Sequence, residues 1–267
     1  MNNRIEHTVD YLRLLRSNGR YAFTFDDLTE AVAKDRKNLR KDLDRLREKG
    51  EILNVRRGFY INIPDEYRNM GTIPVELYVD DLMKYLKSKY YVGLFSAAML
   101  HGAAHQQPQE FFVINESPSL RNIRKHKLAV NFSEKKRFPV HGIDERKTDT
   151  GFIKVSNREL TFLDLIYFEQ KLGGLDRIIT ILQELVEEMQ KSKFSKVLLN
   201  QFPLTVLQRA GYILENILDK EEFALILEKR LLKENYRKTL LSPLGKDTGE
   251  IDKRWKVRVN VEIESEI

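Results

Sequence analysis

The stretch from Thr24 to Ile61 constrains the fold of this chain more than any other part of its sequence. Apolar residues recur there at helical spacing in two successive runs, and Thr24 and Asp35 precede these runs as candidate N-caps. The apolar positions are Phe25, Leu28 and Val32 in the first run and Leu39, Leu43 and Leu46 in the second. Gly50 ends the second run, because glycine adopts the positive φ of a helix C-terminus at little steric cost. The sequence therefore predicts two consecutive helices joined by a turn.

Two short runs rich in β-branched and aromatic residues follow, at residues 52–55 and 58–63. Arg56, Arg57 and Gly58 lie where these runs meet, which is typical of a β-hairpin. An earlier apolar series predicts a third helix that supports the other two, and it comprises Ile5, Val9, Leu12 and Leu15. Helix, turn, helix and a small hairpin are the plan of a winged helix, which lays its second helix in the DNA major groove.

Basic side chains cover the polar faces of the second predicted helix and the tip of the hairpin. The helix carries Arg36, Lys37, Asn38, Arg40 and Lys41, and the hairpin carries Arg56 and Arg57. Basic residues at the start of such a helix suit base edges and phosphates, and arginines in the hairpin suit phosphates or the minor groove. The alternative is a solvated surface, because Asp42, Asp44 and Glu48 add acidic charge to the same helix. The order of helix, basic helix and basic hairpin favours a DNA-binding head.

Length and composition bound the rest of the architecture. A chain of 267 residues is long enough for about two domains, each with its own core. We expect an α+β protein with a winged helix-turn-helix DNA-binding domain over residues 1–65 and a mixed domain over residues 66–267. The formal net charge of +6 fits association with nucleic acid. The absence of cysteine excludes disulfides and thiolate metal sites, and the absence of a long apolar stretch or signal-peptide pattern predicts a soluble, cytoplasmic protein with no membrane partner.

Residues after the hairpin alternate between loop, helix and strand patterns. Residues 64–74 contain two prolines and one glycine, and fit an interdomain linker or an ordered loop against the hairpin. Helical spacing predicts helices at residues 75–86, 90–100, 160–168, 175–189, 194–199, 204–218 and 222–235, with a break at Gly173 and Gly174. Short strands are predicted at residues 111–114, 128–132 and 152–155. A loop at residues 242–253 precedes a half-buried strand from Trp255 to Ile263, where apolar and polar residues alternate. The second domain is predicted to combine a small sheet with a helical array.

Four stretches of the chain resemble the AbiEi family of antitoxins from bacterial type IV toxin–antitoxin (abortive infection) systems. They read DLTEAVAKDRKNLRKDLDRLREKGEILNVRRGFY, YYVGLFSAAMLHGAAHQQPQEFFVIN, TGFIKVSNRELTFLDLIYF and GGLDRIITILQEL. Their order and spacing agree with the family plan across nearly the whole chain. The segment SAAMLHGAAHQQP is the most specific of them, because a winged helix by itself is generic.

The resemblance implies a transcriptional repressor that binds inverted repeats upstream of its own operon. It also implies a C-terminal domain that neutralises a nucleotidyltransferase-like toxin, and stable contact between antitoxin and toxin does not follow from it. The DNA-binding positions it implies are Arg36, Lys37, Asn38, Arg40 and Lys41 in the recognition helix and Arg56, Arg57 and Tyr60 in the wing. It implies no catalytic residue, so we expect no enzyme activity, no cofactor and no metal ion.

Two motifs elsewhere admit other chemistry. His101 and His105 stand four residues apart, which places two imidazoles on one helical face for a metal ion, although Gly102 lies between them. Glu134 and Lys136 have the Glu-x-Lys spacing of many metal-dependent nucleases, in which carboxylates hold Mg²⁺ and lysine offsets the charge of the scissile phosphate. The neighbouring predicted strand offers no aspartate to complete such a site. A helix C-terminus and a charged loop are the simpler interpretations.

Three basic clusters in the second domain leave a further interpretation open. They are residues 121–127, 135–137 and 146–147. If these loops converge, they form a second positive patch for DNA, RNA or an acidic partner; if they are dispersed, they are solvated loops. The leading hypothesis is thus a DNA-binding repressor and antitoxin whose partners are double-stranded DNA and a toxin. Its alternatives are a protein-interaction module that acts through the second domain, and a metal-dependent nuclease that uses Glu134 and Lys136.

Overall fold

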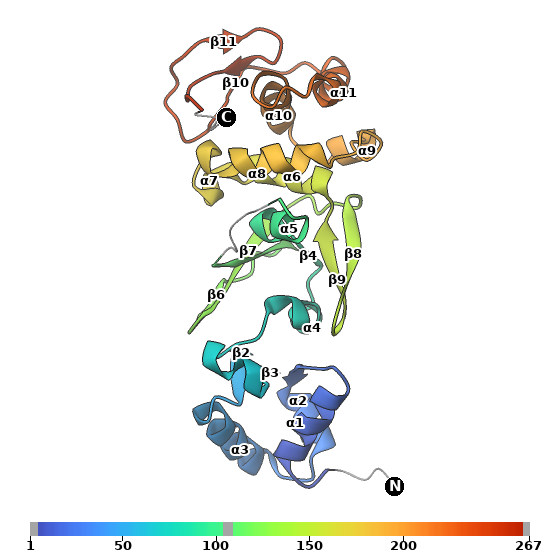
Figure 1. Ribbon diagram of the computed structural model, residues 1–267, viewed down its shortest axis with the longest axis vertical. Helices are drawn as coiled ribbons and strands as arrows, with labels where there is room; N and C mark the ends of the chain where they lie inside the picture. Colours follow the sequence, from blue (N-terminus) through green and yellow to red (C-terminus); the bar gives the residue numbers. More distant parts are fainter. Residues whose placement is uncertain (1–4, 104–108, 264–267) are drawn as a thin grey trace. The chain divides into compact units, whose positions relative to one another are not determined.

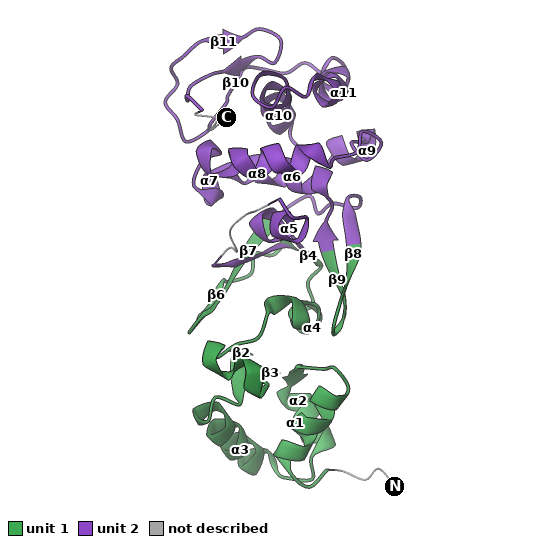
Figure 2. Cartoon of the chain, in the orientation of Figure 1, with its two compact units in different colours: residues 1–90, 115–134, 145–154 green, residues 91–114, 135–144, 155–267 purple. Residues whose placement is uncertain are grey.

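The computed structural model describes residues 5–103 and 109–263, and the chain forms two compact units. Unit 1 comprises residues 1–90, 115–134 and 145–154, and unit 2 comprises residues 91–114, 135–144 and 155–267 (Figure 2). The protein is mixed α/β, with several small sheets and many helices (Figure 1). The predicted domain boundary at residue 65 is a statement about which parts of the chain fold independently. The division into compact units does not test it, so it stays a prediction. None of the helices in the described ranges is long and apolar enough to span a bilayer.

Unit 1 begins with the three predicted helices, the predicted hairpin and one short strand, β1, that was not predicted; we call residues 5–63, which contain them, the head. Their bounds are α1 Thr8–Ser17, β1 Ala22–Thr24, α2 Phe25–Ala31, α3 Arg36–Glu48, β2 Ile52–Arg56 and β3 Phe59–Asn62. Both predicted N-caps are confirmed: Thr24 forms a capping box with Asp27, and Asp35 caps α3. Gly50 has the predicted positive φ, +67°, after the end of α3. Local sequence signals therefore determine where these helices begin and end.

The core of the head forms because the three helices turn their apolar stripes toward one another. The buried side chains are Tyr11, Leu12, Leu15, Phe23, Leu28, Val32, Leu39, Leu43, Leu46 and Ile52. An antiparallel sheet with the strand order β1-β3-β2 lies beside them, and β2 and β3 form the predicted hairpin. The register of this hairpin shifts between Asn54 and Arg56, which marks a β-bulge before the turn.

Three short helical elements follow the head in unit 1. They are the 3₁₀-helices η1 Asp65–Met70 and η2 Val75–Leu77 and the α-helix α4 Val79–Tyr85. The predicted helix at residues 75–86 is therefore confirmed in two pieces. Burial of Val79, Leu82 and Met83 shows that α4 has an apolar face, and its last residue, Tyr85, is exposed.

A six-stranded sheet has the strand order β6-β7-β5-β4-β9-β8, and the residues of its strands are divided between the two units. Its strands are β4 Tyr90–Val92, β5 Phe111–Glu116, β6 Ile123–Lys125, β7 Leu128–Lys135, β8 Ile143–Thr148 and β9 Gly151–Ser156. The three strands predicted from β-branched and aromatic runs are confirmed as β5, β7 and β9. The expectation that the basic clusters at residues 121–127 and 146–147 lie in loops was wrong over β6 and β8. Both are edge strands with many charged side chains, which is how natural sheets avoid edge-to-edge pairing.

The helix predicted over residues 90–100 was wrong in its first third. Residues 90–92 form β4, which pairs in parallel with β9 through Val92 and Val155. Gly93 then has an extended conformation, and α5 runs from Leu94 to Leu100. The continuous apolar run hides this change, because a buried strand and a buried helix lack a polar face that would distinguish them.

Unit 2 is mainly helical. Its helices after α5 are α6 Arg158–Tyr167, α7 Glu169–Leu172, α8 Leu175–Glu187, α9 Lys196–Leu199, α10 Leu204–Asn216 and α11 Glu221–Leu231. Helix α6 packs against α5, α8 and α10, and α10 packs against α11 (Figure 1). Gly173 and Gly174 both have positive φ and separate α7 from α8, as predicted. The apolar stripes of these helices meet in one core that includes most of their leucines.

The long strand predicted from Trp255 to Ile263 was wrong over most of its length. Only Val257 and Arg258 form a strand, β12, which lies between β10 Thr239–Leu240 and β11 Ile251–Asp252. Lys256 has a φ of +52°, which interrupts the pleat, and the flanking strands offer only two residues each for pairing. The alternating apolar residues are nevertheless used, because Val259, Val261 and Ile263 pack against the core of unit 2.

Candidate nucleic-acid interface

The start of helix α3 displays the basic residues that the sequence nominates. Asp35 accepts hydrogen bonds from the backbone N–H groups of Lys37 and Asn38 at 2.9 and 3.0 Å. These bonds hold the pKa of the Asp35 carboxyl below its usual value, because they favour the charged form. Leu39 lies on the buried face, and the side chains of residues 36, 37, 38, 40 and 41 are exposed. The Asn38 amide also donates to Asp35, so it is tied to the cap.

Two of the arginines on α3 stack on one aromatic ring. The guanidinium carbon of Arg36 lies 4.6 Å from the centroid of the Phe25 ring, and that of Arg40 lies 5.6 Å from it. Arg36 also forms an exposed ion pair with Asp26, with 3.3 Å between Nη2 and Oδ1. Residues four apart on a helix lie on the same face, so both arginines reach back over the first residue of α2.

The turn of the β2–β3 hairpin is held from two sides. The backbone N–H of Phe25 donates to the carbonyl of Gly58 at 2.9 Å, and the Tyr85 hydroxyl donates to the carbonyl of Arg57 at 2.8 Å. Gly58 has a φ of +80°, and a Cβ atom there would lie 2.8 Å from the Tyr85 hydroxyl oxygen. The positive φ favours glycine at this position, and a larger residue would also displace the Tyr85 hydroxyl.

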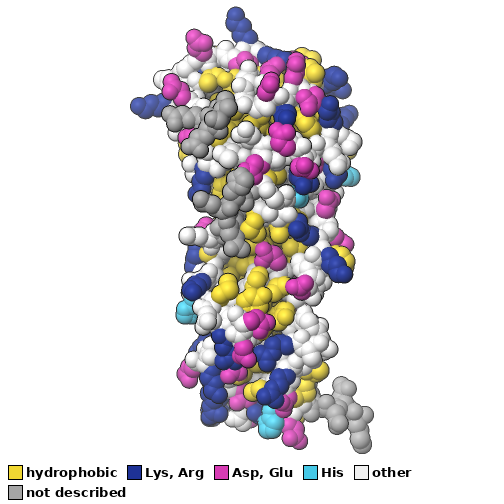
Figure 3. Space-filling view, in the orientation of Figure 1, with side chains coloured by type: hydrophobic (Ala, Val, Ile, Leu, Met, Phe, Trp, Pro, Cys, Tyr) yellow, Lys and Arg dark blue, Asp and Glu magenta, His cyan; other side chains and the backbone are white. Residues whose placement is uncertain are grey.

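A groove of about 580 Å³ lies where α3, the start of α2, the hairpin turn and the end of α4 meet within unit 1. It is lined by Phe25, Asp26, Arg36, Arg40, Arg57, Gly58, Tyr60 and Tyr85. Four of the predicted DNA-binding residues thus lie around one concave surface. The Tyr60 ring stacks on that of Phe23 at 5.4 Å between centroids, and burial raises the pKa of its hydroxyl. On the face drawn in Figure 3, Lys and Arg side chains alternate with Asp and Glu over the N-terminal part, so the surface there is mixed rather than uniformly basic.

Arg56 does not line this groove. Its guanidinium donates to the carbonyl of Arg121 and lies 5.8 Å from the ring centroid of Phe132, both in residues 115–134 of unit 1, which we call the β6–β7 segment. Burial lowers its pKa, and the charge of Arg121 lowers it further. Lys125 reinforces the contact by donating to the carbonyl of Asn54 at 2.5 Å. Arg56 and Lys125 thus connect the β6–β7 segment to the hairpin of the head.

Sequence reasoning missed Phe25 and Tyr85 as residues of this surface. Phe25 was assigned only to the apolar stripe of α2, although its ring also supports two arginines. The Tyr85 hydroxyl donates a hydrogen bond to the carbonyl of Arg57, which lies 28 residues earlier in the chain. No local sequence pattern indicates that contact. Only the tertiary structure brings these residues to the groove.

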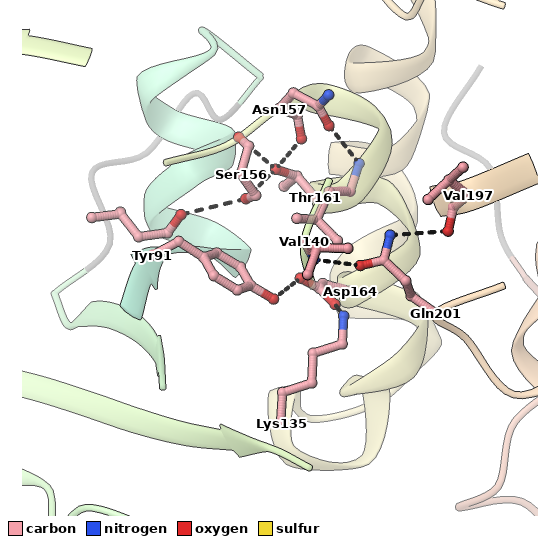
Figure 4. A network of polar contacts seen from close by, with 11 residues as sticks. Tyr91, Lys135, Val140, Ser156, Asn157, Thr161, Asp164, Val197 and Gln201 are labelled. Carbon is pink, nitrogen blue, oxygen red and sulfur yellow. Dashed lines mark hydrogen bonds and ion pairs between the residues drawn. The ribbon is translucent and has the colours of Figure 1, made fainter. Parts of the chain in front are cut away.

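Unit 2 contains a buried polar network on helix α6 (Figure 4). The Lys135 ammonium lies 2.5 Å from one carboxylate oxygen of Asp164, and the Tyr91 hydroxyl donates to the other at 2.6 Å. The two charged side chains are 3% and 0% exposed, and the ammonium lies 4.0 Å from the ring centroid of Phe202. Burial raises the pKa of Asp164 and lowers that of Lys135, because it disfavours both charged forms. The expectation that Lys135 belongs to an exposed basic loop was wrong: it is the last residue of β7 and points into the core.

The alternative metal sites receive no support from the part of the chain that the structure describes. No three histidine, aspartate or glutamate side chains within residues 5–103 and 109–263 lie together in a way that could hold a metal ion. Lys136 is exposed beyond the end of β7, and Glu134 is half-buried. Nε2 of His101 lies 2.7 Å from the carbonyl oxygen of Ser156, whereas His105 lies outside the described residues.

Comparison with known proteins adds a family and a fold. Residues 91–216 match the model of the AbiEi antitoxin C-terminal domain. The crystal structure of the RV2827C protein from Mycobacterium tuberculosis superposes with a TM-score of 0.64 at 15% identity, over 96% of this chain and 92% of that one, and so shares the fold. A nucleotidyltransferase-like antigenic protein from Paracoccidioides brasiliensis gives a TM-score of only 0.37 at 7% identity, over 57% of this chain and 91% of that one, and carries no argument. No curated protein matches the chain.

Proposed function

Because the chain belongs to the AbiEi antitoxin family through residues 91–216, we propose that it is an antitoxin of a toxin–antitoxin pair that also represses its own operon by binding DNA. The observation that supports the DNA-binding role is the groove that gathers Arg36, Arg40, Arg57 and Tyr60. Three guanidinium groups around one concave surface suit phosphates and the acceptor-rich edges of guanine.

The head fits the plan of a winged helix-turn-helix, with α3 as recognition helix and the β2–β3 hairpin as wing. In this mode α3 enters the major groove by its N-terminal end, which is where its exposed basic residues are concentrated. Arg36 and Arg40 read base edges, and Lys37 and Lys41 contact phosphates on either side. Arg57 grips the flanking backbone from the wing. Two protomers on an inverted repeat then block transcription.

The remaining predicted contacts have more restricted roles in this proposal. Asn38 can approach DNA while it stays bonded to Asp35, since its carbonyl oxygen lies at the other end of the amide. Arg56 supports the wing through the Arg121 carbonyl and adds positive charge beside it rather than a direct base contact. Tyr60 supplies a hydroxyl at the edge of the groove.

The partner of an AbiEi antitoxin is a toxin, and we propose a nucleotidyltransferase-like one. The family domain, residues 91–216, is the part of this chain to which we assign neutralisation. This assignment requires no stable complex between the two proteins.

The DNA-binding role is tested by titrating the full chain against DNA from upstream of its own gene and against random DNA at physiological salt. Arg40→Ala should weaken specific binding by about 1–3 kcal/mol, and Arg57→Ala should weaken binding to both DNAs and reduce the salt dependence. Arg47→Ala is the matched control, because Arg47 is an exposed arginine near the opposite end of α3. Equal binding of wild-type protein to both DNAs, or equal effects of all three substitutions, would contradict the proposal.

A further inference from the structure

We propose that Phe25 and Tyr85 are positioning residues of the DNA interface, and that they hold its three arginines in place before DNA arrives. This inference rests on the proposed function and extends it. Both aromatic residues line the groove together with Arg36, Arg40 and Arg57. Neither belongs to the recognition helix or to the wing, so each acts on the arginines from a neighbouring element.

Phe25 is fixed more firmly than an ordinary surface aromatic residue. It is the first residue of α2, directly after the capping box of Thr24, and its backbone N–H donates to the carbonyl of Gly58. The ring therefore has a defined place between α2, α3 and the wing. The guanidinium carbons of Arg36 and Arg40 lie 4.6 and 5.6 Å from its centroid, within the distance at which a cation is attracted to a ring.

The gain from this arrangement is preorganisation. A free arginine side chain samples many rotamers and loses that freedom when it binds DNA. An arginine that already rests on an aromatic ring loses less, and its planar fork is aimed in one direction. Asp26 restricts Arg36 further through the exposed ion pair, which DNA phosphates can displace because such pairs are weak in water.

Tyr85 acts on the wing. Its hydroxyl donates to the carbonyl of Arg57, and its ring lies 5.4 Å from that of Phe59 at an interplanar angle of 38°. The absence of a side chain at Gly58 lets Tyr85 approach the turn this closely. This hydrogen bond thus fixes the backbone of Arg57 beside the groove, while the Arg57 side chain stays exposed and can reach a phosphate.

The two residues should therefore affect recognition differently. Phe25 supports two arginines that we assign to base edges, so its loss should reduce the preference for the operator. Tyr85 supports one arginine that we assign to the DNA backbone, so its loss should weaken binding to all sequences alike.

Phe25 is tested by fluorescence anisotropy of the full chain with operator and random DNA. Phe25→Leu should weaken operator binding about fivefold or more, because each exposed cation–π contact corresponds to roughly a two- to fivefold effect. Phe25→Tyr keeps the ring and should stay within about twofold of wild type. In an Arg36→Ala/Arg40→Ala background, Phe25→Leu should have no further effect. If Phe25 were purely structural, Phe25→Leu would still weaken binding in that background. Phe25→Leu and Phe25→Tyr would then differ only in their unfolding midpoints.

Tyr85 is tested in the same assay by Tyr85→Phe, which removes only the hydroxyl and keeps the ring against Phe59. Binding to both DNAs should weaken by about twofold to fivefold, as expected for one lost hydrogen bond that orders the turn. The effect should vanish in an Arg57→Ala background. This variant also keeps the inference falsifiable if Phe25→Leu fails to fold.

The outcomes separate this inference from the proposed function. If wild-type protein prefers its operator but neither Phe25→Leu nor Tyr85→Phe changes binding, the positioning role is overturned and the DNA-binding role stands. If the effects persist in the arginine-free backgrounds, the two residues stabilise the head without positioning these side chains, and the inference is again overturned. If wild-type protein shows no preference for its operator, both proposals fail.

Discussion

Replacing Lys135 by methionine should destabilise the protein far more than its position after a run of polar residues suggests. The ammonium of Lys135 is the only cation that the structure places on the buried Asp164 carboxylate among the described residues, at 2.5 Å. Methionine keeps most of the aliphatic stem beside Phe202 and removes the charge. Asp164 then retains only the hydrogen bond from Tyr91.

The expected cost follows from the burial of the pair. Removing one partner of a buried ion pair leaves an uncompensated charge and typically costs about 3–5 kcal/mol. For a chain of this size, each 1 kcal/mol lowers the unfolding midpoint by roughly 2–4 °C, so we expect a decrease of about 6–20 °C near neutral pH. The adjacent Lys136→Met is the matched control, since Lys136 is exposed and its replacement should change stability by no more than about 0.5 kcal/mol.

The pH dependence of the variant carries a definite sign. Burial already raises the folded-state pKa of Asp164, and removing the lysine raises it further. Below the unfolded pKa of about 3.9 the carboxyl is protonated in both states, so the lost ion pair carries no charge penalty there. As pH rises from the unfolded pKa through the raised folded pKa, the carboxyl ionises more readily in the unfolded state than in the folded state, so the variant loses stability. The gap between wild type and Lys135→Met should therefore widen with increasing pH.

The measurement is urea unfolding of wild type, Lys135→Met and Lys136→Met at several pH values from acidic to neutral. A Lys135→Met/Asp164→Leu double variant should recover much of the lost stability, because it buries no unpaired charge. The reasoning is refuted if Lys135→Met and Lys136→Met are equally stable, or if the stability gap narrows as pH rises.

Three further substitutions test packing, capping and an ion pair. Gly211→Ala places a Cβ atom within van der Waals overlap of the buried Trp255 ring and should cost about 1–3 kcal/mol by thermal unfolding, despite the higher helix propensity of alanine. An unchanged midpoint would show that Trp255 moves freely. Thr24→Ala removes the capping box of α2 and should cost about 1 kcal/mol, with Thr24→Ser retaining most of it. Arg254→Met should lower stability at pH 7 but much less at pH 3. Arg254 holds the pKa of Glu228 below its usual value, and the stability that this pair contributes is lost as pH falls through that lowered pKa. A loss of stability that is equal at both pH values would be inconsistent with this pair.

The sequence predicted the head in detail because its information is local. N-caps at Thr24 and Asp35, the glycine after α3 and the period of the leucines all act within a few residues of the structure they determine. The same holds for the break at Gly173 and Gly174 and for the amphipathic helices of unit 2. Such signals specify where elements begin and end without reference to their neighbours.

Strands depend on partners, and there the sequence was less informative. The alternation from Trp255 to Ile263 is that of a half-buried strand, yet a ladder forms only at Val257 and Arg258, where both flanking strands supply residues. The edge strand β8 has the opposite character, since its charged side chains suggest a loop although its backbone is extended. Whether a segment becomes a strand is decided by what lies beside it.

The exposure of basic side chains is the property for which the local sequence pattern and the tertiary structure differ most. Lys135, Lys136 and Arg137 are adjacent in sequence, yet only the last two are exposed, because β7 continues to residue 135 and directs that side chain into the core. Arg56 and Arg57 also differ, since Arg56, at the bulge, donates to the Arg121 carbonyl and Arg57 lines the groove. Counting basic residues therefore overstates how many of these cations are exposed at the surface. If the head binds DNA as we propose, Arg56→Ala should alter the stability of the hairpin more than the salt dependence of DNA binding, and Arg57→Ala should show the reverse.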